Sequence, residues 1–228
     1  MFRNLTTACT RPRVSENVIV SLSVLTLCAR RVMPGVRRPW KMCRILLAWE
    51  CVKTRSEMTS LALVGLLRLI EGAQIPVWLD GGWGVDALLG TQTRTHKDVD
   101  LILSVRDVPE LQELLSRRGF RLKDGEPPDS FVLADGAGLE VDVHAVTFDE
   151  EGNGIYRMRN GEDWVYPAEG FGGSGLVAGA RVRCLSPAAQ VLCHAHGYTP
   201  TEKDFRDMEL LRHRFGVELP PHLRRGLT

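Results

Sequence analysis

The pattern of hydrophobic and polar residues changes near residue 58. Before that point the one long apolar run, residues 18–29, shows neither strand alternation nor convincing helix caps. After it, apolar residues either recur at the three- and four-residue spacing of amphipathic helices or alternate with polar residues, as in half-buried strands. The second part of the chain is therefore predicted to be the folded domain.

Helices and strands are predicted to succeed one another through this second part. Helical spacing, with Ser186 as a cap and Pro187 at a first helical position, predicts helices over residues 59–71, 83–89, 108–117, 186–196 and 200–215. Apolar and alternating stretches predict strands over residues 76–79, 98–105, 120–123, 130–134 and 139–147. This order predicts an α/β (α+β) fold, in which a mixed sheet is followed by C-terminal helices.

Glycine-rich connections complete the prediction. Gly81 and Gly82 predict a tight turn between the first strand and the second helix. Residues 149–175 are rich in Gly, Asn and acidic residues and are expected to form an irregular surface excursion, followed by a returning hairpin over residues 176–185. The expected organisation is an N-terminal extension (1–57), a core (58–185) and a C-terminal helical region (186–228).

The formal charge follows the same division. The 228 residues carry a net charge of +1, but residues 1–57 hold eleven Lys and Arg against three Glu, so the rest of the chain is acidic. A signal peptide fits poorly because Arg30 and Arg31 follow the apolar run directly, and a transit peptide would lack that run. We expect a basic extension outside the functional domain, disordered or partly helical, or the product of a start codon assigned too far upstream.

Composition also excludes several classes of protein. No apolar run reaches the roughly 18 residues that a membrane-spanning helix needs, so no membrane partner is expected. Four of the six cysteines lie in the basic extension, and their spacing matches no metal-binding motif. The rest of the chain retains Cys184 and Cys193, which favours a reducing compartment without disulfides.

Acidic residues share one face of two predicted strands. Asp98 and Asp100 alternate with apolar residues on the first strand, and Asp142 and His144 do so on the second. If the strands are neighbours, Asp98, Asp100 and Asp142 converge. Crowded carboxylates repel unless a cation neutralises them, and hard oxygen ligands suit Mg²⁺ together with substrate phosphates. The alternative is a solvated sheet face, and glycosyltransferases also use such a pair of acids.

The glycine pair upstream favours the metal-binding interpretation. Gly81 and Gly82 lie between a strand and a helix, where a backbone without Cβ atoms can approach a phosphate group. A phosphate-binding turn, an Asp pair some sixteen residues later and a third carboxylate on a further strand form a combination more specific than any of its parts.

The combined motifs resemble the antibiotic nucleotidyltransferases of the DNA polymerase β-like superfamily, in particular the lincosamide and aminoglycoside 2″ enzymes. The resemblance covers about residues 60–215. The position of His144 resembles the lincosamide branch, since the aminoglycoside branch has Glu there. The similar stretches are residues 78–86 (WLDGGWGVD), 94–100 (RTHKDVD), 141–144 (VDVH), 184–186 (CLS), 196–198 (HGY) and 201–207 (TEKDFRD).

This resemblance implies a nucleotidyltransferase that uses Mg²⁺ and ATP, or another NTP, and transfers a nucleoside monophosphate to a drug hydroxyl with release of pyrophosphate. By position, Asp98 and Asp100 would ligate magnesium. Asp142 would share a metal ion or accept the proton of the attacking hydroxyl. The triphosphate would be held by Gly81 and Gly82, with Arg94 and Lys203 as charge partners.

For nearby aromatic and imidazole side chains, a purely structural role is weighed against a role in the site. His144 either orients substrate or is a sheet-face histidine bonded within the sheet, and His96 is expected to be structural. Trp164 and Tyr166 either wall an acceptor pocket or anchor a long loop. The sequence leaves both interpretations open for these positions.

The sequence thus predicts a magnesium-dependent adenylyltransferase, located in the cytoplasm where ATP is available, that acts on a lincosamide- or aminoglycoside-like small molecule. The alternatives are an enzyme of the same fold that modifies a protein or tRNA, as in toxin–antitoxin pairs, and a non-catalytic nucleotide-binding module. The acidic second part argues against a nucleic acid partner. Asp204 and Asp207 are expected to face basic neighbours or solvent, or to attract a cationic acceptor.

Overall fold

The computed structural model describes residues 57–158, 160–196 and 199–224. The predicted N-terminal extension lies, apart from Glu57, outside the described residues. Among the described residues, no helix is long and apolar enough to cross a membrane.

The predicted helices are confirmed with small shifts at their ends. Capping side chains fix several of these ends, because Thr59 and Ser186 each accept a hydrogen bond from a backbone N–H of the first turn. Gly90 ends its helix in the left-handed conformation, as predicted. The α-helices are α3 (Ser60–Gly72), α4 (Gly81–Leu89), α5 (Val108–Ser116), α6 (Pro187–Ala195) and α7 (Glu202–Phe215).

The strands form a mixed sheet, which confirms the predicted fold class. In the described part of the chain seven strands join in the order β1-β2-β5-β4-β3, with β6 and β7 added beyond β5, while β8 and β9 pair separately. The strands are β1 (Val77–Asp80), β2 (Asp98–Ser104), β3 (Arg121–Glu126), β4 (Ser130–Ala134), β5 (Glu140–Phe148), β6 (Gly154–Arg157), β7 (Asp163–Tyr166), β8 (Ser174–Val177) and β9 (Ala180–Arg183). Among the named strands of the described residues, β2 and β5 are the one parallel pair, and they lie next to each other within the sheet.

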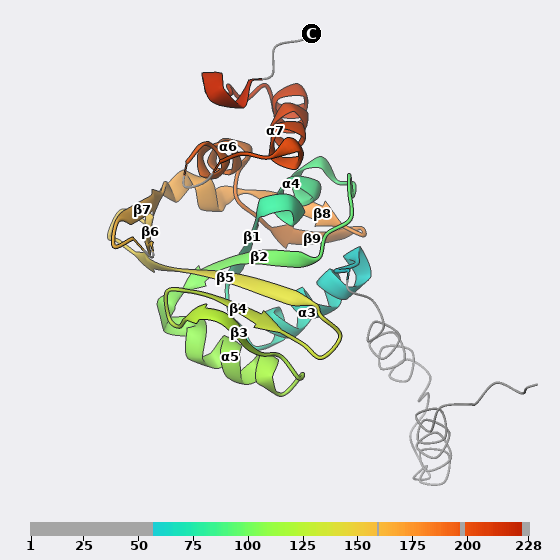
Figure 1. The fold of residues 1–228 in the computed structure, drawn as a ribbon, viewed down its shortest axis with the longest axis vertical. Helices are drawn as coiled ribbons and strands as arrows, with labels where there is room; N and C mark the ends of the chain where they lie inside the picture. Colours follow the sequence, from blue (N-terminus) through green and yellow to red (C-terminus); the bar gives the residue numbers. More distant parts are fainter. Residues whose placement is uncertain (1–56, 159, 197–198, 225–228) are drawn as a thin grey trace, which may run out of the picture. The chain divides into compact units, whose positions relative to one another are not determined.

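One face of the sheet forms the main core. Alternate residues of β2 and β5, such as Val99, Leu101, Val141 and Val143, are fully buried and pack with apolar residues of α3 and α5. Figure 1 shows these two helices on one side of the sheet and α4, α6 and α7 toward the other. Burying a side chain of this size contributes about 1.5–3 kcal/mol, so this face fixes the strand order. The polar residues of both strands must then point away from it.

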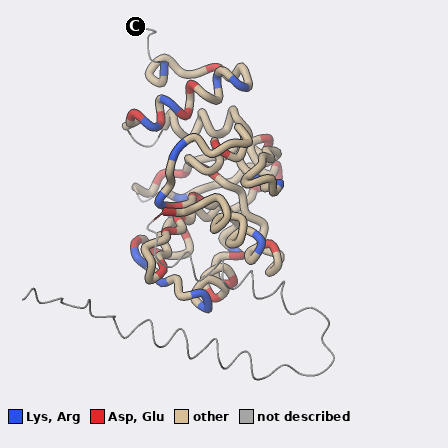
Figure 2. The backbone as a smooth tube through the Cα atoms, turned by 90° about the vertical axis from the view of Figure 1, so that its right-hand side faces the viewer, with Lys and Arg blue, Asp and Glu red and all other residues tan. Residues whose placement is uncertain are grey.

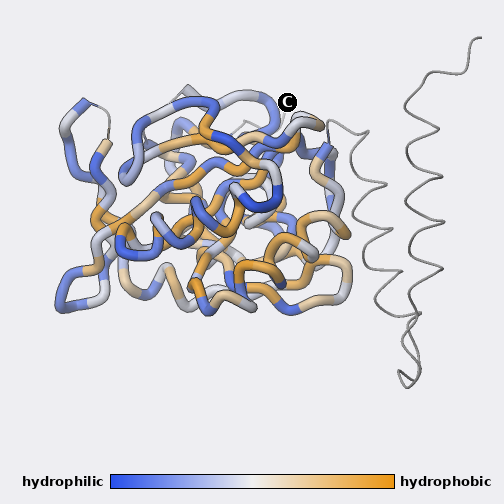
Figure 3. Tube along the Cα trace, turned by 90° about the horizontal axis from the view of Figure 1, so that it is seen from below, coloured by the Kyte–Doolittle hydropathy of each residue, from blue (hydrophilic) through white to orange (hydrophobic). Residues whose placement is uncertain are grey.

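The opposite side carries two smaller apolar clusters around the polar strand faces. In one, α4, α6 and α7 pack together through Val85, Val191, Met208 and Leu211. The other places Tyr166 among residues of the sheet and of α6. Figure 3 shows hydrophobic positions through the middle of the chain trace and hydrophilic ones at the turns around it. The polar strand ends are therefore left at the bottom of a recess between apolar clusters.

Two sequence predictions are wrong in detail. Gly81 and Gly82 do not form a separate turn, because helix α4 begins at Gly81 with Asp80 as its N-cap. The segment 149–175 is not an irregular excursion, since it contains the hairpin β6–β7, which pairs with the end of β5. The hairpin predicted over residues 176–185 is confirmed as β8–β9.

Candidate active site

Three adjacent strands carry aspartates at one level of the sheet. Asp100 on β2 is paired in register with Asp80 on β1 and with Asp142 on β5. Directly paired residues extend their side chains to the same face, and all three line one cavity of about 460 Å³. The structure thus brings Asp100 and Asp142 side by side, as expected for neighbouring strands, and adds Asp80 to the row.

His144 lies within this carboxylate group. Its Nε2 atom is 3.8 Å from Oδ1 of Asp142 and 4.0 Å from Oδ1 of Asp100. One potential ligand atom from each of the three residues lies within 4.8 Å of the others, which is a spacing that one metal ion could bridge. Its two carboxylates, Asp100 and Asp142, are oxygen donors of the kind that fit Mg²⁺.

Electrostatics in this group favour a bound cation. Burial alone would lower the pKa of His144, but its contact with Asp100 and the negative charges of Asp142 and Asp100 raise that pKa to about 9. Burial would likewise raise the pKa of Asp100, and His144 outweighs it and holds that pKa below its usual value. A protonated imidazole among carboxylates therefore supplies positive charge in the metal-free protein.

Asp98 lies at the outer end of the same strand face. It is exposed, lines the cavity, and is outside the compact group formed by the other residues. Burial of its carboxyl group and the nearby charge of Asp100 raise its pKa. Of the three predicted carboxylates, Asp100 and Asp142 thus lie close enough to share one centre, while Asp98 lines the cavity outside that centre.

The glycine pair adjoins the carboxylates. Gly81 has a φ of +55°, and its N–H donates a 2.7 Å hydrogen bond to Oδ1 of Asp80. A Cβ atom at Gly81 would collide with the carboxylate of Asp100, and one at Gly82 would collide with the guanidinium of Arg94. The start of α4 is therefore a concave backbone surface that only glycine allows, at a helix N-terminus that favours an anion.

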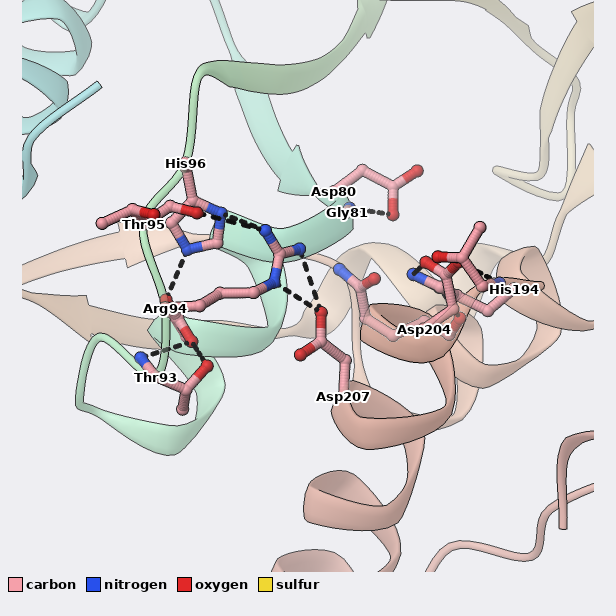
Figure 4. A network of polar contacts seen from close by, with 12 residues as sticks. Asp80, Gly81, Thr93, Arg94, Thr95, His96, His194, Asp204 and Asp207 are labelled. Atoms are coloured by element: carbon pink, nitrogen blue, oxygen red, sulfur yellow. Dashed lines mark hydrogen bonds and ion pairs between the residues drawn. The ribbon is translucent and has the colours of Figure 1, made fainter. Parts of the chain in front are cut away.

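Two positive side chains line the same cavity, and one of them, Arg94, adjoins Gly82. Arg94 comes from the loop before β2, and Lys203 from the first turn of α7, and both line the cavity. The Arg94 guanidinium donates to Oδ2 of Asp207 from Nε at 3.3 Å and from Nη2 at 3.0 Å, as Figure 4 shows. All seven predicted site residues, Gly81, Gly82, Arg94, Asp98, Asp100, Asp142 and Lys203, thus line one cavity.

Aromatic residues line the side of the cavity formed by the β6–β7 hairpin. Tyr156 stacks edge-on against His144 with ring centroids 5.6 Å apart, and Trp164 lies 5.3 Å from the ring of His196. Met158 and Tyr166 complete this wall. Trp164 and Tyr166 therefore line the cavity and also pack the hairpin, so the two interpretations left open by the sequence are compatible.

The aspartates of α7 are buried, so of the alternatives left open by the sequence the solvent-facing one is wrong. Asp207 is 1% exposed and pairs with Arg94. Asp204 is 3% exposed and accepts hydrogen bonds from the backbone N–H and the hydroxyl of Thr201, at 2.8 and 2.7 Å. Neither carboxylate is solvated, although Asp204 lies at the cavity edge.

Several residues that line the cavity were not predicted from the sequence. Asp80 directly precedes the glycine pair, and its alignment with Asp100 follows only from strand pairing. Tyr156, Met158 and His194 also line the cavity. Tyr156 pairs with Trp164 in the β6–β7 hairpin. The two aromatic residues could have indicated this hairpin, but the glycine-rich sequence around them concealed its strands.

A mixed sheet with paired carboxylates beside a glycine-initiated helix defines the protein as a nucleotidyltransferase. A family model described as aminoglycoside-2″-adenylyltransferase matches residues 62–211, and the chain belongs to this family.

Individual relatives agree with this assignment. A lincosamide resistance protein from Staphylococcus haemolyticus is 28% identical over 157 residues, which is 69% of this chain and 96% of the relative. A 2″-aminoglycoside nucleotidyltransferase from Escherichia coli is 29% identical over 53% of this chain and 64% of its own length. The crystal structure of the lincosamide antibiotic adenylyltransferase LnuA with lincomycin bound has 29% identity and a TM-score of 0.58, and it covers 66% of this chain and 94% of that one.

Proposed function

We propose that this protein transfers AMP from ATP to a hydroxyl group of a small antibiotic, of the lincosamide or aminoglycoside type, and releases pyrophosphate. The observation that carries the proposal is the pairing of Asp100 with Asp142 next to the glycine start of α4. Together they offer a carboxylate group for a cation and a concave backbone for phosphates within one cavity.

Asp100 and Asp142 would hold Mg²⁺ at their shared centre, with Asp98, which lines the same cavity, as a further carboxylate for the ion. When bound, the ion neutralises negative charge on the carboxylates and the triphosphate. Gly81 and Gly82 would bind the phosphates through the backbone. Asp142, which lines the cavity, would share the metal ion or accept the proton of the attacking hydroxyl.

The two sides of the cavity favour different substrates. The side with Gly81, Arg94 and Lys203 suits the triphosphate, because it combines a helix N-terminus with two cationic side chains. The aromatic side around Tyr156 and Trp164 suits the apolar body of an acceptor. A cavity of about 460 Å³ is of the size that holds small molecules.

The acceptor is proposed to be a small molecule rather than a nucleic acid. Five aspartates but one Arg and one Lys line the cavity, a balance that attracts cationic ligands and metal ions. Figure 2 shows basic and acidic positions mixed along the described backbone rather than collected in a basic stripe. Since the reaction consumes ATP, we also propose that the protein acts in the cytoplasm.

The test is to incubate the purified protein with MgATP and supply lincomycin, clindamycin and a series of aminoglycosides one at a time. We expect one antibiotic to acquire the mass of an AMP unit, with one pyrophosphate released per product. Failure to modify any of them, by a protein that still binds MgATP, would refute the antibiotic acceptor and point to a protein, RNA or metabolite instead.

A further inference from the structure

A continuous row of polar contacts runs from α4 to α7 along the wall of the cavity. Oδ2 of Asp86 lies 2.6 Å from Nε2 of His96, and Nδ1 of His96 lies 3.0 Å from Nη1 of Arg94. Arg94 in turn contacts Oδ2 of Asp207 at 3.0 Å. Figure 4 shows the guanidinium between His96 and Asp207. The row thus connects helix α4, the loop before β2 and helix α7.

The directions of these hydrogen bonds follow from the chemistry of the groups. A guanidinium can only donate, so Nδ1 of His96 must accept from Arg94. The ring's remaining N–H, on Nε2, then donates to Asp86. The other carboxylate oxygen of Asp86 accepts from the backbone N–H and hydroxyl of Thr93, at 3.1 and 2.6 Å. Each member of the row therefore has a single consistent role.

The imidazole is held on its face as well as at its edges. Trp83 stacks on His96 with ring centroids 4.5 Å apart and an interplanar angle of 34°. Asp86, His96 and Asp207 are 2%, 3% and 1% exposed. Burying polar groups costs free energy unless they are hydrogen-bonded, so this row persists only in its paired form. Arg94 and His96 both line the cavity, and the other contacts of the row hold them in place.

The geometry leaves part of the guanidinium facing the glycine start of α4. The Arg94 guanidinium has five N–H groups. Among the described residues, two of them donate to Asp207, one to His96 and one, at 3.5 Å, to the carbonyl of Thr95. The remaining hydrogen is on Nη2. That atom is the first that a Cβ on Gly82 would meet, so it adjoins the backbone proposed to bind phosphates.

We propose that His96, backed by Asp86, is a positioning residue that fixes the Arg94 guanidinium for contact with the nucleotide phosphates. The inference rests on the proposed function for its ligand and adds the reason why an imidazole is buried there. Both ring nitrogens of His96 are occupied, by Arg94 and by Asp86, so His96 acts through Arg94 rather than by a hydrogen bond of its own to the nucleotide. Its loss therefore weakens nucleotide binding and leaves the binding of the acceptor unchanged.

Binding of magnesium with α,β-methylene-ATP, which cannot transfer AMP, tests this without requiring turnover. We expect His96→Leu to raise the dissociation constant measured by calorimetry about tenfold, the effect of losing one hydrogen bond to a charged group. His96→Gln should restore most of the affinity, because its amide keeps one acceptor for Arg94 and one donor for Asp86. In turnover, KM for ATP should rise while KM for the antibiotic stays unchanged.

A double-mutant cycle shows whether His96 acts through Arg94. Arg94→Lys keeps the charge but loses the planar group that contacts both His96 and Asp207. In that background, His96→Leu should cause no further loss of affinity. Arg117→Lys is the matched control, since Arg117 forms an exposed pair with Glu113 on α5, and it should bind as the wild type does.

Several outcomes would overturn the proposal. Unchanged affinity in His96→Leu, or equal losses of affinity in the wild-type and Arg94→Lys backgrounds, would leave His96 with a structural role only. If His96→Leu fails to fold, a His96→Gln variant that folds but binds as weakly as Arg94→Lys would have the same meaning. A wild-type protein that binds the analogue but modifies no antibiotic refutes the proposed acceptor alone, and one that does not bind the analogue refutes both proposals.

Discussion

At the residue scale, Gly81 is the position where local backbone and chemistry depend most directly on each other. Its φ of +55° lies in the left-handed region, which costs other residues about 1–2 kcal/mol, and an added Cβ would strike the Asp100 carboxylate. We therefore expect Gly81→Ala to reduce kcat/KM for ATP by at least about tenfold, as measured by steady-state kinetics.

A second glycine offers a matched control. Gly65 lies in the middle of α3, is exposed, and has open space where its Cβ would be. Gly65→Ala should leave kcat/KM unchanged and stabilise the protein by roughly 0.5–1 kcal/mol. If the two variants had the same activity, the close approach of Gly81 to the carboxylates would be irrelevant to the reaction.

His144 provides a prediction for pH dependence. Its pKa of about 9 in the metal-free protein lies above the ordinary value of about 6.5, so protonation stabilises the folded state. That stabilisation is fully present below pH 6.5 and is lost as the pH rises through 9. Magnesium adds positive charge beside the ring, so it should lower this pKa.

Nuclear magnetic resonance of the imidazole measures both effects. We expect the His144 resonances to titrate near pH 9 without metal and at lower pH with MgCl₂. Denaturation of the metal-free protein should show a loss of stability over the same range, reduced in His144→Gln. An ordinary pKa, insensitive to magnesium, would mean that His144 does not lie among these carboxylates in solution.

At the scale of elements, local patterns predicted most of the fold. Strict alternation around Val99 and Val141 placed β2 and β5, and caps such as Ser186 placed helix starts, because each depends on neighbours in sequence. The hairpin β6–β7 was missed, since its strands are four residues long and lie among glycines. Their stability comes from pairing with β5 and from aromatic packing, which no local pattern encodes.

The same distinction explains the site. Because polar and apolar residues alternate on β2 and β5, the sequence predicted that Asp98, Asp100 and Asp142 converge if these strands are neighbours. They are neighbours, and all three aspartates line one cavity. The burial of Asp207 did not follow, because its partner Arg94 lies 113 positions away in the chain. Charged residues on a helix usually face solvent, so only the tertiary contact reveals this ion pair.

The hairpin yields a prediction about the acceptor. On β7, Trp164 faces the cavity, whereas its neighbour Val165 is 45% exposed. Trp164→Ala should raise KM for the antibiotic by about tenfold or more, since it removes a large aromatic surface, and leave KM for ATP nearly unchanged. Val165→Ala on the same strand should alter neither constant. Equal effects of both variants would indicate that the hairpin contributes only to stability.

At the scale of the whole molecule, we predict that the folded domain begins near Met58. Met58 is 2% exposed, and its N–H donates to the carbonyl of His96 at 2.8 Å. A chain that begins at Met58 retains this side chain and a donor at the same nitrogen. We expect its free energy of unfolding and its activity to match those of the full chain, within about 1 kcal/mol for unfolding.

A chain that begins at Ser60 makes the comparison sharper. It lacks the buried Met58 side chain and the Thr59 cap of α3, and should be less stable by roughly 2–5 kcal/mol in urea denaturation. Loss of folding in the chain that starts at Met58 would show that residues 1–57 belong to the folded domain. Equal stability of the two shortened chains would show that Met58 contributes nothing to the core.

The central claim is that the row of aspartates on β1, β2 and β5 carries out nucleotide transfer. Asp100→Asn tests it most directly, because the change removes charge and almost no volume from the middle of the row. Asp107→Asn is the control, since Asp107 precedes α5 without a capping hydrogen bond from its side chain. The measurement is pyrophosphate release from MgATP in the presence of the antibiotic that the wild-type protein modifies. The account predicts release by the wild type and Asp107→Asn, and none by a folded Asp100→Asn; wild-type release by Asp100→Asn would contradict it.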